Sequence, residues 1–257
     1  MKLQKWFMSV AAVAVLAAPG AAQAALITAW DYTVNAHWEN WTPGSVTNFV
    51  EGNEDVLQWG TEDDGGQSNG LSQLRVTNNI AGTIITNDGV GSPGATVTHN
   101  NFAIDPPTLE STDLVVDLTF GPSGSGESVP FTQTFFIDFD ETLNQEPCLP
   151  DSASVCDDIF VLNNPSDLSV QFQVEDYLYT ASLVFDEANF EGGQIFFDDL
   201  DGDGVAELYF LTQENFSSIL PTNIVITAQQ VPEPAALGLV GAGIFGLGLA
   251  ARRRRKA

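Results

Sequence analysis

Short runs of alternating or wholly apolar residues recur along the middle of this chain, and they constrain the fold more than any other feature. In the run from Phe131 to Phe139, alternate residues fall on opposite faces of an extended strand. One face carries Phe131, Gln133, Phe135, Ile137 and Phe139, which is typical of a half-buried antiparallel strand. No segment shows the 3.6-residue amphipathic period of a helix over about twelve residues.

Gly, Pro, Asn and Asp separate these runs, and each run predicts a strand. The expected strands are Ile27–Val34, Val56–Trp59, Gln73–Asn78, Gly82–Thr86, Ala95–Thr98, Leu114–Phe120, Phe131–Phe139, Ile159–Leu162, Ser169–Val174, Tyr177–Phe185, Gln194–Phe197, Ala206–Leu211 and Asn223–Ala228. Many short strands predict an all-β domain, an antiparallel β-sandwich or jelly roll. The segment Gly121–Gly126 is either a flexible loop in this domain or a boundary between two subdomains.

The charge of this region is one-sided. All 34 acidic residues lie between Asp31 and Glu233, and Arg75 is the only lysine or arginine in that stretch. A domain with no basic surface cannot displace the counterions of nucleic acid, so the composition argues against a nucleic-acid partner. We expect a soluble domain that repels itself at low salt and that divalent cations stabilise.

Residues 1–24 have the parts of a secretory signal peptide. Lys2 and Lys5 form a basic region, an apolar core runs from Phe7 to Ala18, and Ala22-Gln23-Ala24 is a cleavage site. We expect export through the Sec translocon and cleavage by signal peptidase after Ala24. Residues 25–230 then form the extracytoplasmic domain.

The other end of the chain is apolar and then strongly basic. The run from Ala235 to Ala251 has no charged or polar side chain, and as a helix it would be about 25 Å long, slightly short of a roughly 30 Å hydrocarbon core. Lysine and arginine stay on the cytoplasmic side, so everything before Ala235 should lie across the membrane. The basic tail consists of Arg252, Arg253, Arg254, Arg255 and Lys256.

The motif Val231-Pro232-Glu233-Pro234 stands directly before this apolar run. Residues 231–257, with motif, apolar helix and arginine cluster in that order, resemble the PEP-CTERM sorting signal of Gram-negative bacteria. The resemblance implies that an exosortase, a membrane processing enzyme, cuts near the motif and passes the protein to the cell surface or the exopolysaccharide matrix. The two prolines prevent regular pairing and hold the motif extended, which suits a processing site. A plain membrane anchor with a proline-rich stalk is the alternative.

A second resemblance lies inside the acidic domain. Thr98-His99-Asn100-Asn101 resembles the motif of the THxN family of PEP-CTERM proteins, with Thr98, His99 and Asn101 as the matching residues. The stretches Leu57–Gly60, Gln67-Ser68 and Glu141–Asn144 are also similar to that family. The resemblance implies a class of exported protein and a cellular location, and it implies no particular reaction. From the residues alone, His99 either fixes a loop by hydrogen bonds, which we expect, or contacts a ligand.

Cys148 and Cys156 are the only cysteines, and seven residues separate them. In an oxidising compartment we expect them to form a disulfide, with two free thiols as the alternative. The spacing excludes a CxxC redox pair, and two cysteines alone make a poor zinc site.

An acidic loop is the best candidate for a metal site. Asp199, Asp201, Asp203 and Glu207 stand at alternating positions around two glycines, and carboxylates on such a turn direct their oxygens to one point. The loop resembles the calcium loop of integrin-type β-propeller repeats, although it ends in Glu and occurs once. It is no EF-hand, because Phe210 stands where the bidentate Glu belongs. We expect Ca²⁺ here; a solvated acidic turn is the alternative.

Two other patterns are weaker. Residues 66–70 fit the G-x-S-x-G pattern of hydrolases, but a polar turn precedes them, and only His37 and His99 are available as bases, so we attribute the match to chance. Four tryptophans lie in the first part of the extracytoplasmic domain and could form a sugar-stacking platform, although we expect core burial. They are Trp30, Trp38, Trp41 and Trp59.

The sequence therefore predicts an exported, acidic, all-β protein that is anchored in the membrane before processing. We expect a non-enzymatic structural or interaction role at the cell surface or in the exopolysaccharide matrix. A carbohydrate-binding module is the first alternative. An extracellular glycan hydrolase is the second, although acidic residues are so abundant that no single pair is informative.

Overall fold

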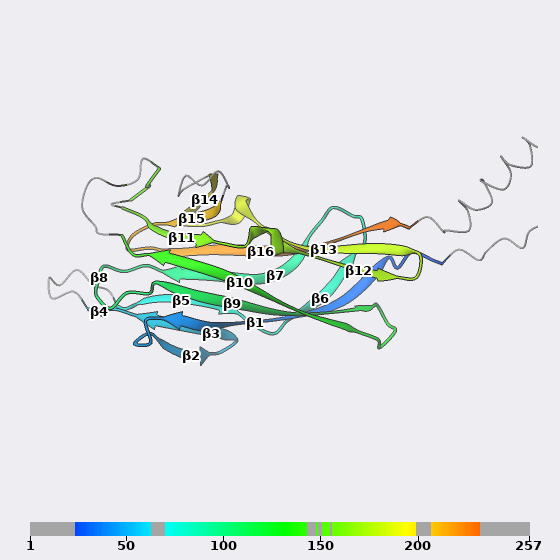
Figure 1. Ribbon diagram of the computed structural model, residues 1–257, viewed down its shortest axis with the longest axis horizontal. Coiled ribbons are helices and arrows are strands. Elements are labelled where there is room, and N and C mark those ends of the chain that lie inside the picture. The colour runs from blue at the N-terminus through cyan, green and yellow to red at the C-terminus, as the bar shows by residue number, and fades with distance from the viewer. Residues whose placement is uncertain are drawn as a thin grey trace, which may run out of the picture.

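The computed structural model describes residues 24–62, 70–142, 148, 151–154, 156–198 and 207–231. These residues form an antiparallel β-sandwich of two seven-stranded sheets, with a small two-stranded sheet of β4 (Thr61–Glu62) and β8 (Ile104–Asp105) beside it (Figure 1). Two short 3-10 turns, η1 (Pro165–Leu168) and η2 (Glu187–Asn189), are the only helical segments in the described part. The all-β sandwich expected from the sequence is confirmed.

Each large sheet combines strands that are distant in the sequence. The first sheet has the order β14 (Gly193–Asp198), β15 (Glu207–Thr212), β11 (Asp158–Leu162), β10 (Val129–Asp140), β9 (Ser111–Pro122), β1 (Ala29–Thr42) and β6 (Ile80–Ile85). The second has the order β12 (Ser169–Val174), β13 (Tyr177–Phe185), β16 (Ser217–Gln230), β7 (Ser92–Asn100), β5 (Ser72–Thr77), β3 (Glu54–Trp59) and β2 (Thr47–Glu51).

The core lies between the two sheets, because strict alternation turns one face of each strand inward. In β1, every second residue from Trp30 to Trp38 is buried and the residues between them face outward. Leu74 and Val76 of β5 and Ile224 and Ile226 of β16 do the same from the opposite sheet. Burial of these apolar side chains supplies the main stabilising term, about 25 cal/mol per Å² removed from water.

Every strand expected from the sequence is present, but some bounds differ and three strands were missed. β16 begins at Ser217 rather than Asn223, because Pro221 sits at a register shift opposite β7, where a missing N–H is tolerated. β2 was missed because all of its residues are exposed, so it has no inward period. β4 and β8 contain two residues each, too few for a pattern.

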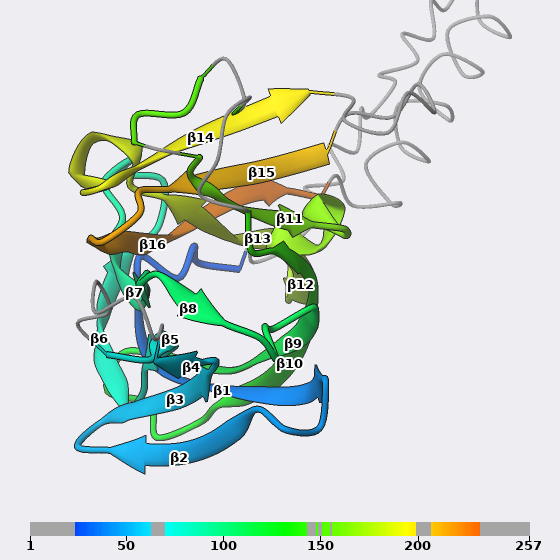
Figure 2. The same ribbon diagram turned by 90° about the vertical axis from the view of Figure 1, so that its left-hand side faces the viewer.

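The sandwich is elongated and has two distinct ends. β16 runs from Ser217, which pairs with Asn100, to Gln230, which pairs with Tyr177, a span of roughly 45 Å. We call the end that holds Gln230 and the turn between β12 and β13 the tail end. The opposite end, where β10 and β15 finish and β11 begins, is called the acid end (left in Figure 1, and nearest the viewer in Figure 2).

Candidate functional site

Both described chain ends meet at the tail end. Val231, the first residue of the sorting motif, donates its backbone N–H to the carbonyl of Asp176 over 2.7 Å. The backbone N–H of Ala24 donates to the Asp176 carboxylate over 3.0 Å. Asp176 lies in the turn between β12 and β13, so one turn holds the chain where it enters and leaves the sandwich (Figure 1). The chain therefore enters and leaves the sandwich at the same end.

Several of the expected site residues lie outside the described residues. These are the signal peptide up to residue 23, Pro232, Glu233 and Pro234 of the motif, the basic tail, and Asp199, Asp201 and Asp203 of the acidic loop. Glu207 is described and pairs with Asp198 at the start of β15. Among the residues that the structure describes, no helix has the length and apolarity to cross a membrane.

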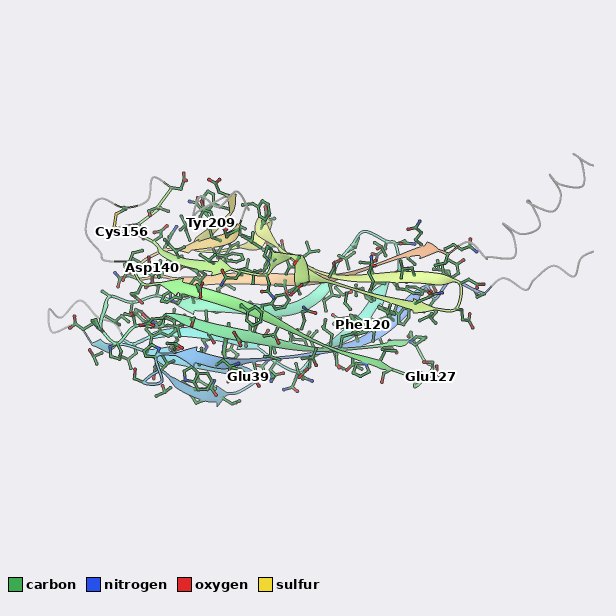
Figure 3. The ribbon with its side chains drawn as sticks, viewed as in Figure 1. Glu39, Phe120, Glu127, Asp140, Cys156 and Tyr209 are labelled. Atoms are coloured by element: carbon green, nitrogen blue, oxygen red, sulfur yellow. A yellow bond between two sulfur atoms is a disulfide. The ribbon has the colours of Figure 1, made fainter. Side chains whose placement is uncertain are left out.

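At the acid end, three carboxylates come together that the sequence had not singled out as a group. Glu141 follows β10, Asp158 begins β11, and Glu214 follows β15. One carboxylate oxygen from each lies within 4.8 Å of the others. Figure 3 places Asp140, which directly precedes Glu141, and Cys156 together at this end. We call this group the carboxylate cluster.

The loop between β10 and β11 positions the carboxylate cluster. A disulfide joins Cys148 and Cys156, as expected from the sequence. The hydroxyl of Thr142 donates to the Cys156 carbonyl, and the Thr142 backbone N–H donates to Asp158 Oδ1 over 2.9 Å. The backbone N–H of Glu214 donates to Ser154 Oγ over 2.8 Å. The crosslinked loop is thus hydrogen-bonded to the backbone of Glu214 and to Thr142, which in turn donates to the Asp158 carboxylate.

The environment of the cluster disfavours its negative charge. Burial raises the pKa of Glu141 to about 7, although the hydrogen bond from Trp59 lowers it in part and the nearby Glu214 raises it further. Burial first, and then the Glu141 charge, raise the pKa of Asp158 well above its usual range. Arg75 cannot offset these charges, because it is paired with Glu51 at 2.7 Å and Glu54 at 2.6 Å.

His99 and Asn101 of the THxN resemblance lie directly behind the cluster, whereas Thr98 of β7 pairs with Arg75 and Ile219 within the second sheet. His99 is buried near the end of β7, and its Nδ1 atom is 2.9 Å from Thr212 Oγ1. The Thr212 hydroxyl donates to the Asp158 carbonyl over 3.4 Å, while the Asn101 amide donates to the Thr212 carbonyl over 3.4 Å. His99 and Asn101 therefore tie the second sheet to the strand ends that carry the cluster, which supports the structural role expected for His99.

His99 is held neutral by its surroundings. Burial lowers the pKa of His99 from 6.5 to about 3. His99 lines an apolar cavity of about 80 Å³ between the sheets, and its Nε2 has no hydrogen-bond partner among the described residues. A neutral, enclosed imidazole of this kind is not a solvent-accessible base.

The fold joins three stretches that the THxN resemblance had indicated separately. The rings of Trp59 and His99 are stacked, with centroids 5.7 Å apart and an interplanar angle of 14°. The indole N–H of Trp59 donates to Glu141 over 3.1 Å. One residue from each of three distant stretches therefore takes part in a single contact chain. Asp158 and Glu214 were missed, because in a chain with 34 acidic residues no sequence signal separates them from the rest.

The tryptophans are core residues. Trp30, Trp38 and Trp59 are at most 2% exposed, and Trp41 packs partly buried against the same core. Burial removes the first three from any sugar-stacking platform and confirms the expected core placement. Of the G-x-S-x-G match, only Gly70 belongs to the described residues.

The architecture is that of an acidic β-sandwich with a disulfide-closed loop at one end and a sorting segment leaving from the other. The family model of the PEP-CTERM protein-sorting motif matches residues 230–255, so the chain carries this signal. A search among curated proteins finds no significant match to the chain. The motif implies an exported precursor that is anchored in the membrane and then processed by an exosortase for delivery to the surface.

Proposed function

We propose that this chain is a non-enzymatic structural or interaction protein of the cell surface or exopolysaccharide matrix of a Gram-negative bacterium. The observation that carries the proposal is the position of Val231, whose backbone is bonded at the tail end, so the acid end points away from the membrane until the tail is cut. A rigid sandwich roughly 45 Å long then presents its acid end to the surroundings. The matrix polysaccharide is the proposed neighbour.

The described histidines support a role without catalysis. His99 is enclosed in the core and neutral, and His37 lies 3.2 Å from Glu39 on the surface. Burial of Trp30, Trp38 and Trp59 disfavours a carbohydrate-binding module in which these tryptophans stack on sugars. Release of reducing sugar when the purified protein is incubated with the producer's matrix polysaccharide, abolished by one Asp or Glu substitution, would favour a hydrolase instead.

The test of sorting compares the full chain with a variant that lacks residues 231–257. The full chain should appear at the surface or in the medium with both ends shortened, as intact mass spectrometry measures. The deletion variant should lose the C-terminal cut and the surface signal, and a host lacking the exosortase should hold the full chain in the membrane. Equal size and location of both proteins would contradict the proposal.

We also propose the finer assignment to the THxN type. Its support is that Trp59, His99 and Glu141, which come from three separately matching stretches, form one contact chain. The loop of Asp199, Asp201, Asp203 and Glu207 likewise stays a proposed calcium site. A rise in the melting temperature with calcium that Asp201→Ala abolishes would support it, and the absence of any such loss would remove it.

A further inference from the structure

The carboxylate cluster contains a buried oxygen with no donor. Asp158 has 0% exposure, and although its Oδ1 accepts the Thr142 N–H, its Oδ2 has no hydrogen-bond partner among the described residues. A buried charge without a partner is strongly unfavourable, and native proteins rarely retain one without a function. The Asp158 carboxylate lies beside those of Glu141 and Glu214, so a positive group at this point would offset the buried charge.

The spacing of the cluster suits one kind of cation. Calcium binds oxygens at 2.3–2.6 Å, so ligands on opposite sides of the ion are up to about 5 Å apart. The three ligand atoms lie within 4.8 Å of one another. Magnesium demands near-ideal octahedral geometry and usually keeps several waters, so a site of three protein carboxylates favours calcium. The donors are carboxylates alone, which favours hard cations over zinc or copper.

The charge balance points the same way. Arg75 is the single lysine or arginine between Lys5 and Arg252, and it is already paired with Glu51 and Glu54. The neutral donors Trp59 and Thr142 each satisfy one oxygen of the cluster. A divalent ion would offset most of the charge of three ionised carboxylates.

We propose that Glu141, Asp158 and Glu214 bind one Ca²⁺ that ties together the ends of β10, β11 and β15. Water completes the six to eight oxygens that calcium requires. The site is distinct from the Asp199–Glu207 loop. Because its ligands come from three strand ends and the disulfide-closed loop, it forms only after folding, and extracellular calcium at roughly 0.1–1 mM is its expected working range.

Calcium titration by calorimetry of the chelator-treated full chain in detergent tests the site. Asp158→Asn and Glu141→Gln should weaken one binding step at least tenfold, since each removes a charged ligand and keeps the side-chain shape. Glu127→Gln, a surface change at the tail end, and Asp201→Asn, in the other acidic loop, should leave that step in place. No binding up to about 10 mM, well above the usual extracellular range, or a loss only in Asp201→Asn, would overturn the proposal.

Thermal unfolding gives a second test that does not depend on calorimetry. Without calcium, Asp158→Asn should melt at a higher temperature than the wild type, because an amide replaces a repelling buried charge. With calcium, the wild type should gain more stability than Asp158→Asn, which keeps only the other acidic loop, so the order should reverse. An order that is the same with and without calcium would contradict the site, and near-ultraviolet circular dichroism verifies that each variant is folded.

Terbium luminescence locates the ion. Tb³⁺ replaces Ca²⁺ and emits when a nearby tryptophan is excited, and Trp59 touches Glu141 directly. Excitation of tryptophan should produce emission in the wild type, little in Trp59→Phe, and none from this site in Asp158→Asn. Equal emission from all three proteins would show that the ion lies elsewhere.

Discussion

The two ends of the sandwich hold similar aromatic clusters in different polar surroundings. Toward the tail end, Trp30 packs against Phe172 at 5.4 Å and Tyr179 at 4.9 Å between ring centroids. Its indole N–H donates to the neutral hydroxyl of Thr86 over 3.1 Å. Apolar packing and neutral hydrogen bonds are sufficient to hold this end together.

At the acid end the same kind of packing leads to buried charge. Trp59 stacks on His99 and packs against Phe139 at 5.3 Å, but its indole N–H donates to the carboxylate of Glu141. Each buried carboxylate there lowers stability unless it is neutralised. The tail end thus contains groups that stabilise the fold. The acid end retains buried carboxylates that lower the stability of the fold, a feature that is common at binding sites.

Loss of the disulfide should have the largest effect on stability and should act at one end. Replacing Cys148 and Cys156 together by serine should lower the free energy of unfolding by roughly 2–3 kcal/mol, the loop-closure value for so short a loop. Urea unfolding measures this. Hydrogen exchange should accelerate in β11 and stay unchanged in β12 and β13. Equal acceleration of hydrogen exchange in all of these strands would show that the disulfide does not stabilise the acid end selectively.

Matched tryptophan changes sharpen the comparison further. Trp30→Phe and Trp59→Phe remove the same atoms, but Trp59 donates to a carboxylate that is ionised above about pH 7, and Trp30 donates to a neutral hydroxyl. A hydrogen bond to a charge contributes about 1.5–3 kcal/mol and a neutral bond about 0.5–1.5, so without calcium Trp59→Phe should cost roughly 1 kcal/mol more. Chemical denaturation of the two variants should show this difference. Equal losses would mean that Glu141 is not charged in the native protein.

The pH dependence should contain a contribution from His99. Its pKa is about 3 in the folded protein and about 6.5 when unfolded, so the unfolded chain binds the extra proton between these values. The stability that His99 supplies is complete above about pH 6.5 and is lost as the pH falls toward 3. Imidazole NMR signals should remain those of neutral His99 at about pH 5, and in urea they should titrate near 6.5. Protonation of His99 in the native state near pH 6 would contradict its enclosure.

The smallest effect should come from Asp176→Ala at the tail end. The backbone N–H that the Asp176 carboxylate accepts belongs to Ala24, which the expected signal-peptide cleavage removes, while Val231 is held by the Asp176 carbonyl, which the substitution leaves in place. The melting temperature should correspond to a change within about 0.5 kcal/mol. Sorting should also be unchanged. A large loss would show that this side chain organises the exit of the chain.

The sequence by itself determined the class of fold and the position of the sorting signal after the β domain. Alternation in runs such as Phe131–Phe139 specifies which face of each strand is buried, because side chains in a strand point to opposite sides in turn. The sorting signal was legible for a similar reason, because it is one continuous segment of local sequence. The disulfide followed from two cysteines and an oxidising compartment.

Only the tertiary structure decided the location of the carboxylate cluster and the structural role of His99. Glu141, Asp158 and Glu214 are unremarkable acids in an acidic sequence, and pairing of β11 with both β10 and β15 makes them neighbours. His99 gave no local sign that it would stack on Trp59 and bond to Thr212. Contacts of this kind depend on strand order and register between distant segments, which local periodicity does not encode.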